Sequence, residues 1–151
     1  MAFVYRFAKL LEHRRVQLRE AQIALARAVE QASHVDRLLA ETAKALENCR
    51  HRWAQRTTEG LPLGEHLAFE RYLSDLERRL LQLKTARERA WRVVHEKQKR
   101  LMEQDREVKK LERLQEVDYE KFQRDQKKRE QKKLDAYGVR LDPDPLMRNF
   151  P

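Results

Sequence analysis

The chain has 151 residues, of which 39% are charged, only three are glycine and four are proline. A globular domain of this length needs many turns, so this composition argues against one and favours a few long helices. The net charge of +9 favours an acidic partner surface, nucleic acid or an anionic membrane face, without choosing among them. Because no stretch reaches about 18 consecutive apolar residues, we expect no membrane span or secretory signal, and a cytosolic protein.

The first predicted element is a helix over about residues 3–58. Apolar residues recur at alternating steps of three and four from Phe7 to Trp53, and only Arg14 and Thr42 interrupt them. An average step of about 3.5 residues indicates a coiled coil, because a surface helix of a globular domain drifts off so strict a repeat. The lone cysteine, Cys49, lies on this seam, where we expect a reduced core residue.

A turn over residues 59–65 and a second helix over about residues 66–137 follow. The second seam begins at Phe69 and is apolar, with polar interruptions, as far as Leu111. An antiparallel register with its midpoint at Leu61, inside the only strong turn signal before Gly138, fits both seams. The predicted fold is all-α, an antiparallel coiled-coil hairpin. The register pairs Trp53 with Phe69, Leu46 with Leu76, Leu39 with Leu83, Ala32 with Ala90, and Leu11 with Leu111.

The same register predicts that helix 2 overhangs helix 1 at its C-terminal end. Residue 1 would lie opposite about residue 121, so the residues beyond have no partner in the chain. We expect Gly138 to stop the helix and residues 138–151 to form an irregular tail. Within the overhang, residues 121–133 include two acidic residues, Asp125 and Glu130, and seven basic ones: Lys121, Arg124, Lys127, Lys128, Arg129, Lys132 and Lys133.

The sequence contains no recognisable catalytic or metal-binding motif. Its five histidines are scattered, with none three or four residues from another, and there is no CxxC pair, Gly-rich phosphate loop or nucleophile elbow. Because a two-helix rod offers no deep cavity, we predict a protein that is not an enzyme and holds no cofactor or metal.

Two interaction classes remain open from the residues alone. The first is a basic coiled-coil protein that binds nucleic acid, although a leucine-zipper factor places its basic helix before a parallel zipper and not after an antiparallel hairpin. The second is a spacer whose ends bind other proteins, with a generic homodimeric spacer as a variant. A rod holds two contact sites apart by its length.

Three segments resemble the FliJ family, the general export component of the bacterial flagellar type III apparatus. They are the opening Tyr5-Arg6-Phe7-Ala8-Lys9-Leu10-Leu11, the run Phe69-Glu70-Arg71-Tyr72-Leu73-Ser74-Asp75-Leu76 after the turn, and Glu130-Gln131-Lys132-Lys133-Leu134-Asp135 near the end. The resemblance implies a cytoplasmic central stalk of the hexameric flagellar export ATPase. It also implies binding to the cytoplasmic domain of the export gate and to export chaperones, peripheral to the membrane and without specific nucleic acid.

The resemblance assigns the gate contact to the start of helix 2. The family's contact surface corresponds to Tyr72, Leu76, Arg79 and Leu83, and Trp53 on the facing helix adds an aromatic. Tyr72 and Leu76 keep the expected aromatic and leucine, whereas Arg79 and Leu83 replace small and polar residues. Leu76, Leu83 and Trp53 also lie on the seams, so core packing is an alternative role for them.

The resemblance assigns the ATPase contact to the end of the hairpin that carries both termini. This end combines the basic residues of the overhang with an apolar cluster that exceeds what one seam requires. The cluster either binds the ring or only caps the open end of the hairpin. It consists of Phe3, Tyr5, Phe7, Leu10 and Leu11.

Overall fold

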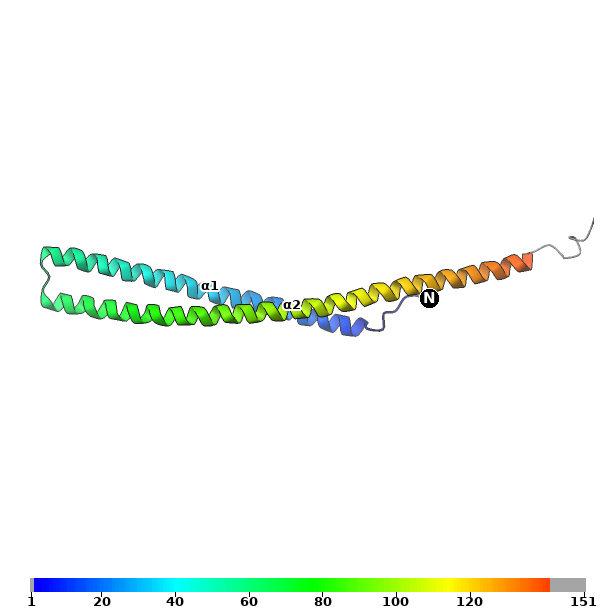
Figure 1. Cartoon of the computed structure of the whole chain (residues 1–151), viewed down its shortest axis with the longest axis horizontal. Coiled ribbons are helices and arrows are strands. Elements are labelled where there is room, and N and C mark those ends of the chain that lie inside the picture. Colours follow the sequence, from blue (N-terminus) through cyan, green and yellow to red (C-terminus); the bar gives the residue numbers. More distant parts are fainter. Residues whose placement is uncertain (1, 142–151) are drawn as a thin grey trace, which may run out of the picture. The chain divides into compact units, whose positions relative to one another are not determined.

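The computed structural model describes the backbone of residues 2–141 and the side chains of residues 2–138. Its secondary structure consists of two helices, α1 (Ala8–Glu59) and α2 (Leu63–Leu141), and the described residues contain no strand. The two helices pack against each other in opposite directions, as Figure 1 shows. The predicted fold class, an all-α helical hairpin, is confirmed.

The turn between the helices depends on Gly60. This residue has a φ of 89°, the only positive φ among the described residues, and Gly60 N donates to the carbonyl oxygen of Thr57 at 3.4 Å. A side chain would meet nothing within 4 Å there, so the demand for glycine comes from the backbone conformation and not from crowding. Helix α2 then starts with the carbonyl of Pro62 accepting from the amides of Glu65 and His66, at 3.0 and 3.1 Å.

The helix ends differ from the expected ones at three places. Helix α1 starts at Ala8 and not near residue 3, because the preceding residues turn: Ala8 N donates to Tyr5 O at 3.2 Å. Helix α2 starts at Leu63 and not near residue 66, and it continues through Gly138 to Leu141. A glycine costs a helix only about 1 kcal/mol, so Gly138 alone does not stop it. The rest of the predicted tail, residues 142–151, lies outside the described residues.

The chain divides into two compact units, which are described separately. The hairpin unit is Val16–Asp105, and the terminal unit combines Met1–Arg15 with Arg106–Pro151. In the hairpin unit a cluster of Leu46, Cys49 and Leu76 forms the buried core near the turn. The rings of Trp53 and Phe69 stack there at 6.2 Å with an interplanar angle of 5°. Trp53 and Phe69 are one of the pairs that the predicted register places opposite each other.

A polar clamp joins the helices further along the hairpin unit. The carboxylate of Asp36 on α1 accepts a hydrogen bond from Arg87 Nε at 2.6 Å and another from Trp91 Nε1 at 3.2 Å. Arg87 occupies a seam position but extends outward, with 54% of its side chain exposed. The long side chain therefore reaches the edge of the seam, where its charge is paired and hydrated.

The terminal unit has its own small core. Tyr5, Leu11, Val108 and Leu111 are buried, and the Tyr5 hydroxyl donates to the Leu111 carbonyl oxygen at 2.8 Å. The non-helical segment that precedes α1 is therefore fixed by a buried side chain. In Figure 1 this dark blue segment runs beside the yellow part of α2.

Candidate partner-binding surfaces

The structure divides the residues expected to contact the gate between surface and core. Tyr72 is 53% exposed and Arg79 is also exposed, whereas Leu76 is buried in the cluster with Leu46 and Cys49. Leu83 and Trp53 are half-buried. Only Tyr72 and Arg79 therefore present a large part of their side chains to a partner.

Tyr72 and Phe69 form a wall shared by two adjoining grooves near the turn, which together we name the Tyr72 groove. The residues lining it come from both helices. They are Ala45, Asn48, Cys49, Arg52 and Arg56 on α1, and Glu65, Ala68, Phe69 and Tyr72 on α2. The sequence reading missed the α1 side. A usable signal was the small side chains of Ala45, Cys49 and Ala68, which leave space beside the aromatic residues.

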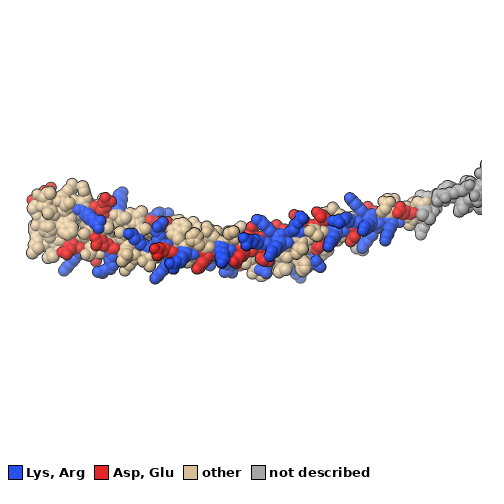
Figure 2. Space-filling model, viewed as in Figure 1, with Lys and Arg blue, Asp and Glu red and all other residues tan. Residues whose placement is uncertain are grey.

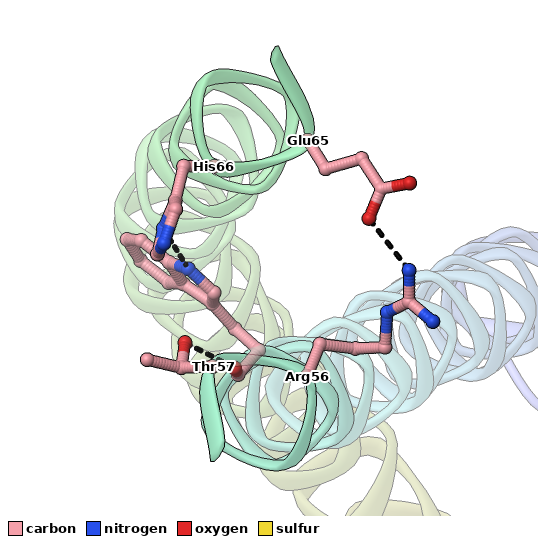
Figure 3. A network of polar contacts seen from close by, with 5 residues as sticks. Arg56, Thr57, Glu65 and His66 are labelled. Carbon is pink, nitrogen blue, oxygen red and sulfur yellow. Dashed lines mark hydrogen bonds and ion pairs between the residues drawn. The ribbon is translucent and has the colours of Figure 1, made fainter. Parts of the chain in front are cut away.

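A network of polar contacts fixes the helices at the turn end of this groove. Trp53 Nε1 donates to His66 Nδ1 at 2.9 Å, and Arg56 donates to Glu65 at 2.6 Å, both from α1 to α2 (Figure 3). Within α1, Thr57 Oγ1 donates to the Trp53 carbonyl at 2.7 Å. The hydrogen bond and charge of Glu65 raise the pKa of the Arg56 guanidinium above its ordinary value. The network therefore presents a defined groove edge.

Most of the apolar cluster at the N-terminus packs within the terminal unit. The Phe3 ring contacts the rings of Tyr119 and Phe122 with centroids 5.3 and 5.4 Å apart, and the Phe7 ring lies 5.8 Å from that of Tyr5. Tyr5 and Leu11 are buried, Phe3 and Phe7 are half-buried, and Leu10 is 42% exposed. Of the two roles left open for this cluster, the packing supports capping for every member except Leu10.

The basic overhang is fully helical and largely uncovered. All of its seven predicted contact residues are exposed: Lys121, Arg124, Lys127, Lys128, Arg129, Lys132 and Lys133. Only one of them forms an ion pair with another described residue, Arg124 with Glu120 at 3.9 Å. Figure 2 shows blue side chains gathered along this part of α2, just before the grey residues. The structure thus leaves an accessible array of cations.

The described residues contain no group of three or more His, Cys, Asp or Glu side chains arranged to hold a metal ion. No described helix is long and apolar enough to span a membrane.

Comparison with known families decides where such a hairpin belongs. The family model for the flagellar FliJ protein matches residues 3–141, which includes α1, the turn and all of α2. The chain belongs to the FliJ family. It is therefore a flagellar export component of a non-catalytic family that interacts with parts of the type III export apparatus. No curated protein and no solved structure matches the chain.

Proposed function

We propose that the chain is the central stalk and coupling component of the flagellar type III export apparatus, acting in the cytoplasm at the inner membrane. In this role the terminal unit enters the hexameric export ATPase and the turn-proximal surface of the hairpin unit binds the cytoplasmic domain of the export gate. Export chaperones are further partners. The observation that carries the proposal is the exposed basic helix beyond Phe122, in a chain that matches the FliJ family.

The distribution of charge around this helix supports a partner that encloses it. Successive residues of an α-helix are rotated by about 100°, so Lys127, Lys128 and Arg129 point to three different sides. Lys121, Lys132 and Lys133 lie within about 40° of one or other of these sides and add to their charge. A flat anionic surface reaches cations on one side only, whereas an acidic ring lumen reaches them all. The proposed partner is therefore a ring whose lumen carries carboxylates.

The test is a pull-down of the purified export ATPase and, separately, of the gate's cytoplasmic domain. We expect the wild-type chain to bind both. A triple charge reversal, Lys127→Glu, Lys128→Glu and Arg129→Glu, should abolish ATPase binding and leave gate binding unchanged. The matched control reverses three exposed basic residues of the hairpin unit, Arg78, Lys84 and Arg92, and should keep ATPase binding. If the wild-type chain binds neither the ATPase nor the gate domain, the proposal is wrong.

The basic overhang and the net charge of +9 also support nucleic-acid binding as the second candidate. Fluorescence anisotropy with duplex and single-stranded oligonucleotides at physiological salt separates the two. Tight binding with a steep dependence on salt would favour the nucleic-acid role, and we expect weak binding. Sedimentation at several concentrations tests the homodimeric spacer, which predicts a stable dimer.

A further inference from the structure

The Tyr72 groove runs along the helices. Its α1 lining has the spacing i, i+3, i+4, i+7 and i+11 from Ala45 to Arg56, and its α2 lining has the spacing i, i+3, i+4 and i+7 from Glu65 to Tyr72. Positions with these spacings share one face of a helix. The groove is therefore a trough between two parallel axes, which is the space that a third helix fills in a helical bundle.

The trough is apolar at its base and has one prominent aromatic at its rim. Cys49 is buried, Ala45 and Phe69 are half-buried, and the Phe69 ring is held by stacking on Trp53. Tyr72 is 53% exposed and makes no ring contact or hydrogen bond with any described residue. A large aromatic beside an apolar trough is the kind of residue that dominates the energy of an interface once a partner covers it.

The charged residues around the Tyr72 groove indicate which charge a partner segment should carry. Arg56 is already paired with Glu65, and Arg50, on the other side of α1, is paired with Glu77 at 3.1 Å. Arg52, which lines the trough, forms no ion pair or hydrogen bond with the described residues. Its guanidinium is available for a carboxylate at the apolar rim, where a charge-assisted hydrogen bond is stronger than on an open surface.

We infer that the Tyr72 groove is the binding site of an acidic amphipathic helix. The helix inserts apolar residues against Phe69 and Tyr72 and places a carboxylate on Arg52. This inference rests on the proposed contact of this surface with the export gate, and it adds the α1 side of the site and the chemistry of the partner segment. A second copy of this chain fits less well, because its net charge of +9 opposes pairing through a face that carries an uncompensated arginine.

The probes are two fluorescein-labelled peptides of about five helical turns with the same apolar positions, one with glutamates and one with lysines along the flanks. We expect the full-length chain to bind the acidic peptide at least about tenfold more tightly than the basic one by anisotropy. Arg52→Glu should remove that preference, and Tyr72→Ala should weaken binding of the acidic peptide by about tenfold or more.

Matched variants separate the groove from the general basicity of the chain. Arg78→Glu changes the net charge as Arg52→Glu does, but Arg78 is an exposed residue of α2 that does not line the groove. Leu81→Ala removes an apolar side chain that is 68% exposed and also outside the groove. Both controls should leave binding unchanged. Circular dichroism of every variant confirms that the helices remain folded.

Three outcomes would overturn the inference. Equal affinities for the two peptides would remove the role of Arg52, and equal losses for Arg78→Glu and Arg52→Glu would reduce the effect to net charge. A wild-type dimer that Tyr72→Ala converts to monomer in sedimentation would show that a second copy occupies the groove. Because the peptides replace the gate, their failure leaves the pull-down result intact, and failure of the pull-down alone contradicts the proposed function.

Discussion

Two parts of α2 have the same helical backbone but differ in what stabilises them, the part near the turn and the overhang. Near the turn, Leu76 is buried against Leu46 and Cys49 of α1, so that part of α2 has a packing partner. Beyond Phe122, all described side chains except Gln126 are exposed, so this part of α2 has no buried face. A helix without a covered face depends on backbone hydrogen bonds and local side-chain pairs, which are weak in water. We therefore expect the overhang to be the part of α2 whose order increases when a partner binds.

The largest expected effect is a difference in amide exchange between these two parts. In the free chain, amides of residues 123–138 should exchange faster than those of residues 69–94 by about two orders of magnitude or more, because the overhang opens locally while the packed part opens with the whole hairpin. Hydrogen exchange followed by mass spectrometry measures the difference. Adding the export ATPase should slow amide exchange in the overhang and leave exchange in residues 69–94 unchanged. Equal protection in the free chain would contradict the comparison.

Truncating the packed cluster should produce the largest change in global stability. Leu46 is only 6% exposed, so Leu46→Ala removes buried methyl groups and leaves a cavity beside Leu76, lowering the free energy of unfolding by about 2–4 kcal/mol. Urea unfolding followed by circular dichroism measures the change. The control is Leu134→Ala in the overhang, whose side chain is 67% exposed and whose removal should cost less than about 0.5 kcal/mol. Similar losses would refute the contrast between the two parts.

The sequence was sufficient to predict the hairpin because two separate features of it agree, the heptad spacing and the position of the turn. The heptad spacing set the face of each helix, and the position of Gly60 set the register, which the stacking of Trp53 on Phe69 confirms. Helix ends were predicted less well. The first residues turn because Tyr5 packs back against α2, a tertiary contact with no local signal, and Gly138 is tolerated within a helix.

The candidate surfaces were predictable in part. Spacing predicts which residues lie on a seam, and Leu76 and Trp53 are indeed packed there. It does not predict which polar residues pair across the helices, since that depends on side-chain geometry. Arg52 and Arg56 lie one helical turn apart on α1, yet Glu65 pairs with Arg56 and leaves Arg52 available. The availability of Arg52 in the α1 lining of the groove therefore followed only from the structure.

A smaller effect is expected from the polar clamp. Asp36→Ala leaves Arg87 and the indole of Trp91 without their acceptor, and the free energy of unfolding should fall by about 1–2 kcal/mol. Trp91 should also become more hydrated, shifting the tryptophan emission to longer wavelength. Asp75→Ala, which removes an exposed carboxylate that makes no described contact, should change neither quantity. No spectral shift in Asp36→Ala would mean that Arg87 and Trp91 hold the clamp geometry without the carboxylate.

The smallest effect is expected in the terminal unit. It tests whether the non-helical segment before α1 is held firmly against α2. Tyr5→Phe keeps the buried ring and removes only the hydroxyl that donates to Leu111 O, so the loss should be about 0.5–1.5 kcal/mol. The Leu111 carbonyl keeps its helical hydrogen bond, which places the change at the lower end. Faster amide exchange at Ala8, whose N–H bonds to Tyr5 O, would report loosening of this segment. The control Tyr137→Phe removes the hydroxyl of a tyrosine on the overhang that is 64% exposed, and it should have no effect on stability.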